Sequence, residues 1–111
     1  MTDLTRYRGD TYADEITITG SDGLPLDITG YVFVMTVDPS KSPTDETNNI
    51  MQINGVILDA ANGLVEFAPT ATDVDQTPRN YYYDIQMTDT SGRKRTIDSG
   101  KYTIVQDITK A

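Results

Sequence analysis

Closely spaced acidic residues are the first feature of this chain that could take part in chemistry. Asp73 and Asp75 form one pair, and Asp22 and Asp27 form a second. Carboxylate oxygens are the ligands that calcium prefers, so either pair could contribute to a calcium site. Neither pair, however, has the alternating ligands and the central glycine of a regular calcium-binding loop. Solvated carboxylates or helix caps are the roles that we favour, and we predict no metal site.

Catalysis by these carboxylates would require a cleft. Glycoside hydrolysis needs two carboxyl groups that flank the substrate, but the chain has only two Phe, no Trp and one long polar loop from which to build a cleft. It also has no His and no Cys, which removes the histidine base of a Ser/His/Asp triad, thiolate chemistry and Cys/His zinc sites. We therefore predict no catalytic residue and no cofactor, and we expect that the protein is not an enzyme.

The tripeptide Arg8-Gly9-Asp10 is another candidate, because it matches a sequence that integrins recognise. Gly9 serves equally well in a turn that leads into the first core strand. The turn is the interpretation that we favour.

The charge of the chain limits its partners. Seventeen acidic residues against nine basic ones give a net charge of −8, which repels the phosphate backbone and anionic lipid alike. No apolar run approaches the roughly 20 residues that span a bilayer. We expect neither nucleic acid nor a membrane as a partner. The basic residues Arg93, Lys94 and Arg95 form a cluster, which is either the solvated flank of a hairpin or a docking point for an acidic neighbour.

Apolar residues at alternate positions, with turn residues roughly every ten positions, predict an all-β sandwich with antiparallel sheets. We expect about seven strands. Their predicted positions are residues 16–18, 31–37, 50–53 and 56–59 (broken near Gly55), 64–68, 81–88, 93–97 and 101–106. Asn62 and Gly63 predict a tight hairpin turn with two positive-φ residues. Thr70, followed by Asp73, predicts a short helical turn near residues 70–76.

The strand pattern also predicts a single domain over residues 1–111. Within it we expect a flexible N-terminal arm at residues 1–7 and a mobile loop at residues 38–49, which is polar and contains prolines. Strand parity assigns twelve residues to the core. They are Ile16, Ile18, Phe33, Met35, Val37, Val65, Phe67, Tyr83, Ile85, Met87, Tyr102 and Ile104.

Some apolar and aromatic side chains fall on the opposite face of these strands. Val32 and Val34 point away from Phe33 and Met35, and Tyr82 points away from the inward Tyr81 and Tyr83. Two explanations remain open for the valines: coverage by the protein's own chain, or a subunit interface. An outward tyrosine is a good interface anchor. The candidate protein interface consists of Val32, Val34, Tyr82 and Val105.

Turn residues and strand parity together support a family resemblance. The segments that carry it are Arg8-Gly9-Asp10-Thr11, Asp22 to Gly30 (DGLPLDITG), Tyr82 to Asp89 (YYDIQMTD) with Ser91-Gly92, and Ser99-Gly100. This pattern resembles the N-terminal domain family of the phage baseplate upper protein (BppU), over about residues 8–109. The resemblance implies an immunoglobulin-like β-sandwich that belongs to a phage virion.

The function that the resemblance implies is structural. We expect a bacteriophage virion structural protein, in the tail or its baseplate, that is synthesised in the host cytoplasm and acts by docking on other virion proteins and by self-association into a homo-oligomer. A capsid decoration or head-to-tail connector protein is the alternative within this class. A carbohydrate-binding or host-adhesion module is the alternative of another class, and for that role the candidate exposed rings are Tyr7, Tyr12, Tyr31 and Tyr82.

Overall fold

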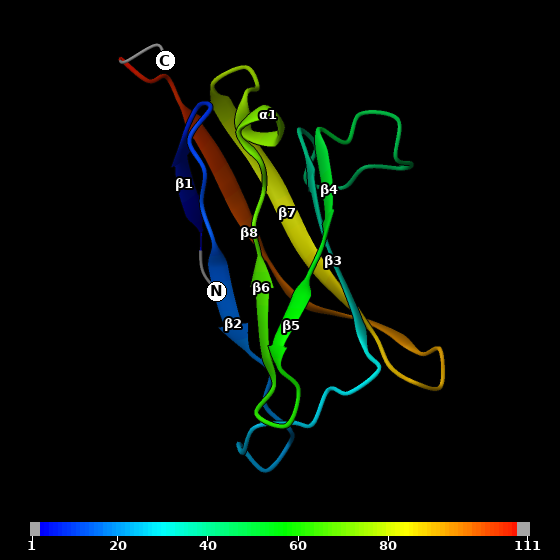
Figure 1. The fold of residues 1–111 in the computed structure, drawn as a ribbon. Helices are drawn as coiled ribbons and strands as arrows, with labels where there is room; N and C mark the ends of the chain where they lie inside the picture. Colours follow the sequence, from blue (N-terminus) through cyan, green and yellow to red (C-terminus); the bar gives the residue numbers. More distant parts are fainter. Residues whose placement is uncertain (1–2, 109–111) are drawn as a thin grey trace.

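The structure is a computed structural model that describes residues 3–108. Two β-sheets pack face to face in a sandwich-like arrangement (Figure 1), which confirms the predicted all-β class. One sheet has five strands in the order β1-β8-β7-β3-β4, and the other has three in the order β2-β6-β5. The strands are β1 (Leu4–Tyr7), β2 (Asp14–Thr17), β3 (Val32–Asp38), β4 (Met51–Asn54), β5 (Val56–Asp59), β6 (Leu64–Phe67), β7 (Arg79–Thr88) and β8 (Lys94–Val105). The immunoglobulin-like topology stays a prediction.

The long hairpin of β7 and β8 lies within the five-stranded sheet. β8 is one continuous strand, whereas the sequence predicts two strands at residues 93–97 and 101–106. That prediction is wrong because Gly100 does not interrupt the ladder but pairs with Tyr83. A register shift between the two strands takes up one extra residue on β8. The bulge therefore replaces the break that the sequence suggests.

β1 differs from its prediction in two respects. The sequence predicts a flexible arm at residues 1–7, but residues 4–7 form a strand beside β8; residues 1 and 2 lie outside the described residues. The pairing is parallel, so this sheet is mixed and not purely antiparallel as predicted. The alternation of partly buried and exposed side chains along β1 explains why this strand forms. Leu4 packs against the core, and Arg6 on the same side forms an ion pair with Asp14 of β2.

The chain passes from one sheet to the other at Gly55, between β4 and β5. A Cβ at this position would lie 2.9 Å from Phe33 Cβ and 2.9 Å from Val65 Cγ2. These two side chains belong to opposite sheets, so the crossing lies directly against the core. Only a residue without a side chain fits there.

The helix α1 (Ala71–Val74) is the short helical turn that the sequence predicts near residues 70–76. Thr70 Oγ1 accepts a hydrogen bond from the backbone N–H of Asp73 (3.2 Å), and Asp73 Oδ2 accepts one from the backbone N–H of Thr70 (2.8 Å). This reciprocal capping box satisfies two donors that a helix start leaves open. Val74 is fully buried, so the turn contributes to the core. No helix within residues 3–108 is long and apolar enough to cross a membrane.

The core lies between the two sheets, and strand parity predicts most of it. All twelve predicted residues are buried except Ile16, which is partly buried because β2 is an edge strand. Tyr81 is buried beside them, as its inward position predicts. Ile28, Met51 and Val74 are further core residues. Parity misses Ile28 and Val74 because they lie outside the strands.

The turn between β5 and β6 forms at the predicted place but with a different geometry. Gly63 has φ +70°, and no non-glycine residue within residues 3–108 has a positive φ, so the prediction of two positive-φ residues is wrong. Gly63 N–H donates to Ala60 O (3.2 Å), and Gly63 O accepts from Ile18 N–H (2.8 Å). The second bond holds the turn against the end of β2.

Replacing Gly63 with alanine should destabilise the domain more than the same change at Gly92. Both glycines have positive φ, but a Cβ at Gly63 would lie 2.4 Å from Ile18 O, whereas a Cβ at Gly92 would meet open space. We expect Gly92→Ala to cost about 1 kcal/mol from backbone conformation alone. Gly63→Ala should cost about 3 kcal/mol or more. Urea unfolding of both variants measures the difference, and equal losses would contradict the close packing of this turn.

A polar cluster closes the sandwich on the side of β1 and β2. The Arg6 guanidinium lies 4.5 Å from the centroid of the Tyr12 ring and forms the ion pair with Asp14. The Tyr102 hydroxyl is buried and has no hydrogen-bond partner in the structure. Burial raises the pKa of Tyr102 to about 12, and the charge of Arg6 opposes this shift. The cluster therefore includes a buried hydroxyl that stays protonated and unpaired.

Removing the Tyr102 hydroxyl should stabilise the protein. Tyr102→Phe keeps the ring in the core but deletes an unpaired polar atom, so we expect a gain of about 1 kcal/mol. Tyr81→Phe is the matched control, because the Tyr81 hydroxyl donates to Thr77 O (2.6 Å) and its loss should cost about 1 kcal/mol. Chemical denaturation compares the two variants. A loss of stability in Tyr102→Phe would show that this hydroxyl has a partner in solution.

Candidate functional site

The four predicted interface residues lie on one face, namely the outer face of the five-stranded sheet. Val34 of β3 stands opposite Gln86 of β7, and β7 carries Tyr82 on the same side by parity. Tyr82 stands opposite Lys101 of β8, and the same parity on β8 leads to Val105. The structure thus places these four residues on one face, which the sequence alone could not show because it does not give the order of the strands.

These four residues do not form one apolar patch. Val32, which is 54% exposed, lies toward one end of the face, whereas Val105 pairs with Tyr7 near the other side of the sheet. Polar side chains stand between them. Thr36 and Asp84 face each other across β3 and β7. The face is therefore mixed in character, with single apolar residues among polar ones.

A hollow of about 390 Å³ lies at the centre of this face. Tyr82 and Asp84 of β7 line it together with Lys101 of β8, and the loop after β3 contributes Lys41. Asp38 and Asp3 complete its set of charged residues. Four separate segments of the chain thus deliver three carboxylates, two amines and two tyrosines, Tyr82 and Tyr83, to the same depression.

A second hollow of about 490 Å³ continues the first along the loop at residues 39–50. The two share Thr36, Pro43 and Asp84 in their linings. The second adds Asp45 and Glu46 from the loop and has no basic residue in its lining. We call the two hollows together the outer groove. Its lining includes five carboxylates and two lysines: Asp3, Asp38, Asp45, Glu46, Asp84, Lys41 and Lys101.

The loop that borders the outer groove is the one predicted to be mobile at residues 38–49. Asp38 itself is the last residue of β3, and no strand or helix forms from residue 39 to residue 50. Arg79 of β7 donates to Pro39 O (3.4 Å), which ties the start of the loop to the sheet. The backbone N–H of Thr47 donates to Asp45 (3.0 Å) and lowers the pKa of that carboxyl, so Asp45 stays charged.

Asp38 is the most unusual side chain of the outer groove. It is only 3% exposed, although its side chain is a carboxylate. Its Oδ1 accepts a hydrogen bond from Ser40 N–H (2.8 Å), whereas its Oδ2 is buried without a partner in the structure. Buried carboxylates are normally paired with a cation or fully hydrogen-bonded. The outer groove therefore has an acceptor in its wall that the described chain does not satisfy.

Asp84 lies where the two hollows meet, and its carboxyl is partly desolvated. Burial raises its pKa above the ordinary value of 3.8. Its cross-strand neighbours, Thr36 on β3 and Ser99 on β8, carry no charge that would compensate it. A carboxylate that loses hydration without gaining a partner is suited to receive a cation from outside.

The basic cluster Arg93, Lys94 and Arg95 is exposed at the β7–β8 hairpin. Asp89 shapes the turn, since its Oδ1 accepts hydrogen bonds from the N–H groups of Ser91 (2.9 Å) and Arg93 (3.0 Å). None of the three basic side chains forms an ion pair with another residue in the range 3–108. The hairpin lies at the opposite end of the molecule from the loop at residues 39–50 (Figure 1).

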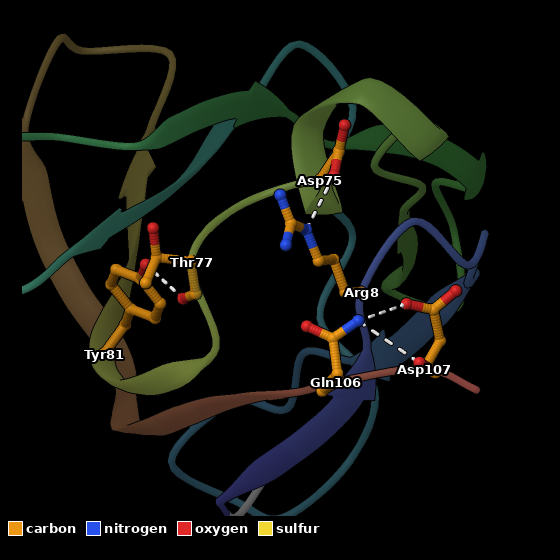
Figure 2. Close-up of polar contacts among 6 residues, drawn as sticks. All are labelled: Arg8, Asp75, Thr77, Tyr81, Gln106 and Asp107. Carbon is orange, nitrogen blue, oxygen red and sulfur yellow. Dashed lines mark hydrogen bonds and ion pairs between the residues drawn. The ribbon is translucent and has the colours of Figure 1, made fainter. Parts of the chain in front are cut away.

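The tripeptide Arg8-Gly9-Asp10 forms a turn, in agreement with the interpretation that we favour. Asp10 N–H donates to Tyr7 O (3.2 Å), and Gly9 has φ +78°. The Arg8 side chain forms an ion pair with Asp75 at 2.8 Å (Figure 2), which joins the end of β1 to the segment after α1. The tripeptide thus has a local structural role in the domain.

The acidic pairs considered for calcium have local roles as well. Asp73 caps α1, and Asp75 pairs with Arg8. Asp22 accepts from Leu24 N–H (3.0 Å), and Asp27 accepts from Thr29 N–H (3.0 Å). Within the part of the chain that the structure describes, no three acidic residues gather in an arrangement that could hold a metal ion.

Comparisons with known proteins add no assignment. A scan against protein-family models and a search of the curated proteins each found no match to this chain.

The sequence points to Tyr82 but misses the acidic residues around it. Asp84 could have been found by parity, since it occupies an outward position two residues from Tyr82. Asp38 directly precedes Pro39, and this pair predicts only that a strand ends there. Nothing in its local sequence indicates burial, because that depends on how the following loop folds.

Neutralising Asp84 should stabilise the domain in a pH-dependent manner. Its pKa is raised in the folded state, so the charged form opposes folding at all pH values above the ordinary pKa of 3.8. We expect Asp84→Asn to add about 0.5 kcal/mol near pH 7, a value reduced for solvent screening, and nothing near pH 3, where both states are protonated.

Asp27→Asn is the control of opposite sign, because the Thr29 hydroxyl lowers the pKa of Asp27, with help from the Thr29 backbone N–H. This variant should lose stability near pH 7. Thermal unfolding at the two pH values measures both effects. A destabilised Asp84→Asn near pH 7 would show that Asp84 has a favourable partner inside the domain.

Proposed function

We propose that this protein is a phage virion structural component of the tail or baseplate, and that it works by docking on neighbouring virion subunits, including copies of itself. The observation that carries the proposal is the outer face of the five-stranded sheet, where Tyr82, Val34 and the outer groove lie together. The resemblance to the BppU N-terminal domain family supports the virion context.

The chemistry of this face suits contact with another protein. Tyr82 offers a large, rigid ring with a polar tip, and such side chains are frequent anchors at interfaces. Asp84 and Lys101 on either side of it can form charge pairs that fix the register of a partner. The mechanism is geometric: a rigid sandwich presents one shaped face, and symmetric repetition multiplies each contact.

Capsid decoration or a head-to-tail connector uses the same contacts at a different place in the virion. Carbohydrate binding is the alternative of another class. The number of exposed tyrosine rings distinguishes it from protein docking, because a sugar needs an exposed flat ring to stack on. The Arg6 guanidinium lies over the Tyr12 ring, and the Tyr31 ring stacks on the Phe33 ring with 6.5 Å between the ring centroids. Each of these two rings is therefore already in contact with another side chain of the domain. Tyr7, at 52% exposure, and the partly exposed Tyr82 are the rings that a sugar could use.

The test combines the mass of the protein in solution with its location in phage particles. We expect oligomers in sedimentation velocity at high protein concentration, and the chain as a stoichiometric band in purified virions. Tyr82→Ala should weaken self-association about tenfold or more. A strict monomer that is absent from particles would refute the proposal, and glycan-array binding that is lost in Tyr82→Ala would favour the adhesion module instead.

A further inference from the structure

The outer groove and the β7–β8 hairpin have opposite charges. The groove lining contains five carboxylates and two lysines, and the hairpin exposes Arg93, Lys94 and Arg95 without an ion pair among the described residues. The chain as a whole has a net charge of −8. Two copies therefore repel each other in most orientations, and contact of the basic hairpin with an acidic surface is the exception.

The hairpin cannot reach the groove of its own chain. The same two strands, β7 and β8, hold both features: Asp84 lies in the groove, and Thr88 ends β7 beside Lys94. An antiparallel ladder with a single bulged residue on β8 joins these positions, so the hairpin cannot bend back over the face. The acidic surface that receives this hairpin must belong to another molecule.

We propose that the Arg93–Arg95 hairpin of one copy docks into the outer groove of a second copy. The proposal rests on the proposed self-association and specifies its contact. Asp38 gives an independent reason for a cationic occupant, since this carboxylate in the groove wall is only 3% exposed and forms no ion pair with another residue in the range 3–108. Guanidinium groups supply several donors and also pack on tyrosine rings, and Tyr82 lines the groove beside Asp84.

The partial desolvation of Asp84 fits the same contact. Burial raises its pKa, so the charged form lacks compensation in the isolated domain. An arriving arginine would supply this compensation on assembly. The residue should then favour association while it opposes the stability of the free domain, which is a common arrangement at binding sites.

A charge-exchange experiment tests the contact directly. The groove variant carries Asp84→Lys and Glu46→Lys, and the hairpin variant carries Arg93→Glu and Arg95→Glu. Each variant alone should associate about tenfold or more weakly than the original protein at low salt, because both of its surfaces have the same sign. A mixture of the two variants should recover association, since each then offers the surface that the other lacks.

The matched control is Glu15→Lys with Glu66→Lys. This pair changes the net charge by the same amount as the groove variant but lies on the three-stranded sheet, where Glu15 and Glu66 stand opposite each other. It should associate at least as well as the original protein. Circular dichroism confirms that each variant is folded.

The outcomes separate this inference from the proposed function. Recovery in the mixture, together with association of the control, supports the hairpin-in-groove contact. Oligomers that persist in both single variants overturn the contact but leave self-association standing. Loss of association in the variants without recovery in the mixture also overturns it, because general charge effects then explain the loss. A monomeric original protein overturns both the contact and self-association.

Discussion

The close approach of the two sheets at Gly55 is the constraint on which the rest of the structure depends. β4 and β5 are consecutive in the sequence but belong to different sheets, so the chain must cross the core boundary within a single residue. Phe33 and Val65 leave no room for a Cβ at that point. The crossing fixes β4 at the edge beyond β3 and β5 at the edge beyond β6. It thereby also fixes the edge of the five-stranded sheet at which the loop at residues 39–50 connects β3 to β4.

Much of this fold can be predicted from the sequence, and the failures have a common physical origin. Strand parity predicts the buried side chains, and the capping box predicts α1, because both depend on neighbours within a few residues. The parallel pairing of β1 and the continuity of β8 depend on contacts between distant segments. Local turn signals at Ser99 and Gly100 are overridden there by pairing with β7.

The candidate site shows the same division. Parity correctly places Val32, Val34, Tyr82 and Val105 on outward positions, but only the strand order shows that these positions share one face. The acidic character of that face depends on the loop at residues 39–50, which brings Asp45 and Glu46 beside Asp84. A loop without regular structure has no periodicity from which to predict this arrangement. Its contribution to the surface therefore becomes visible only in three dimensions.

The parallel alignment of β1 with β8 also affects how the domain would carry mechanical load. The chain enters β1 at Leu4, which stands beside Tyr102, and leaves β8 at Val105, which stands beside Tyr7. A pulling force applied between these two points acts along the strands in opposite directions. It loads the four paired positions in shear, so their hydrogen bonds must fail together and not one after another. Under tension between these two points, the domain would gain resistance to unfolding from this arrangement without any additional contact.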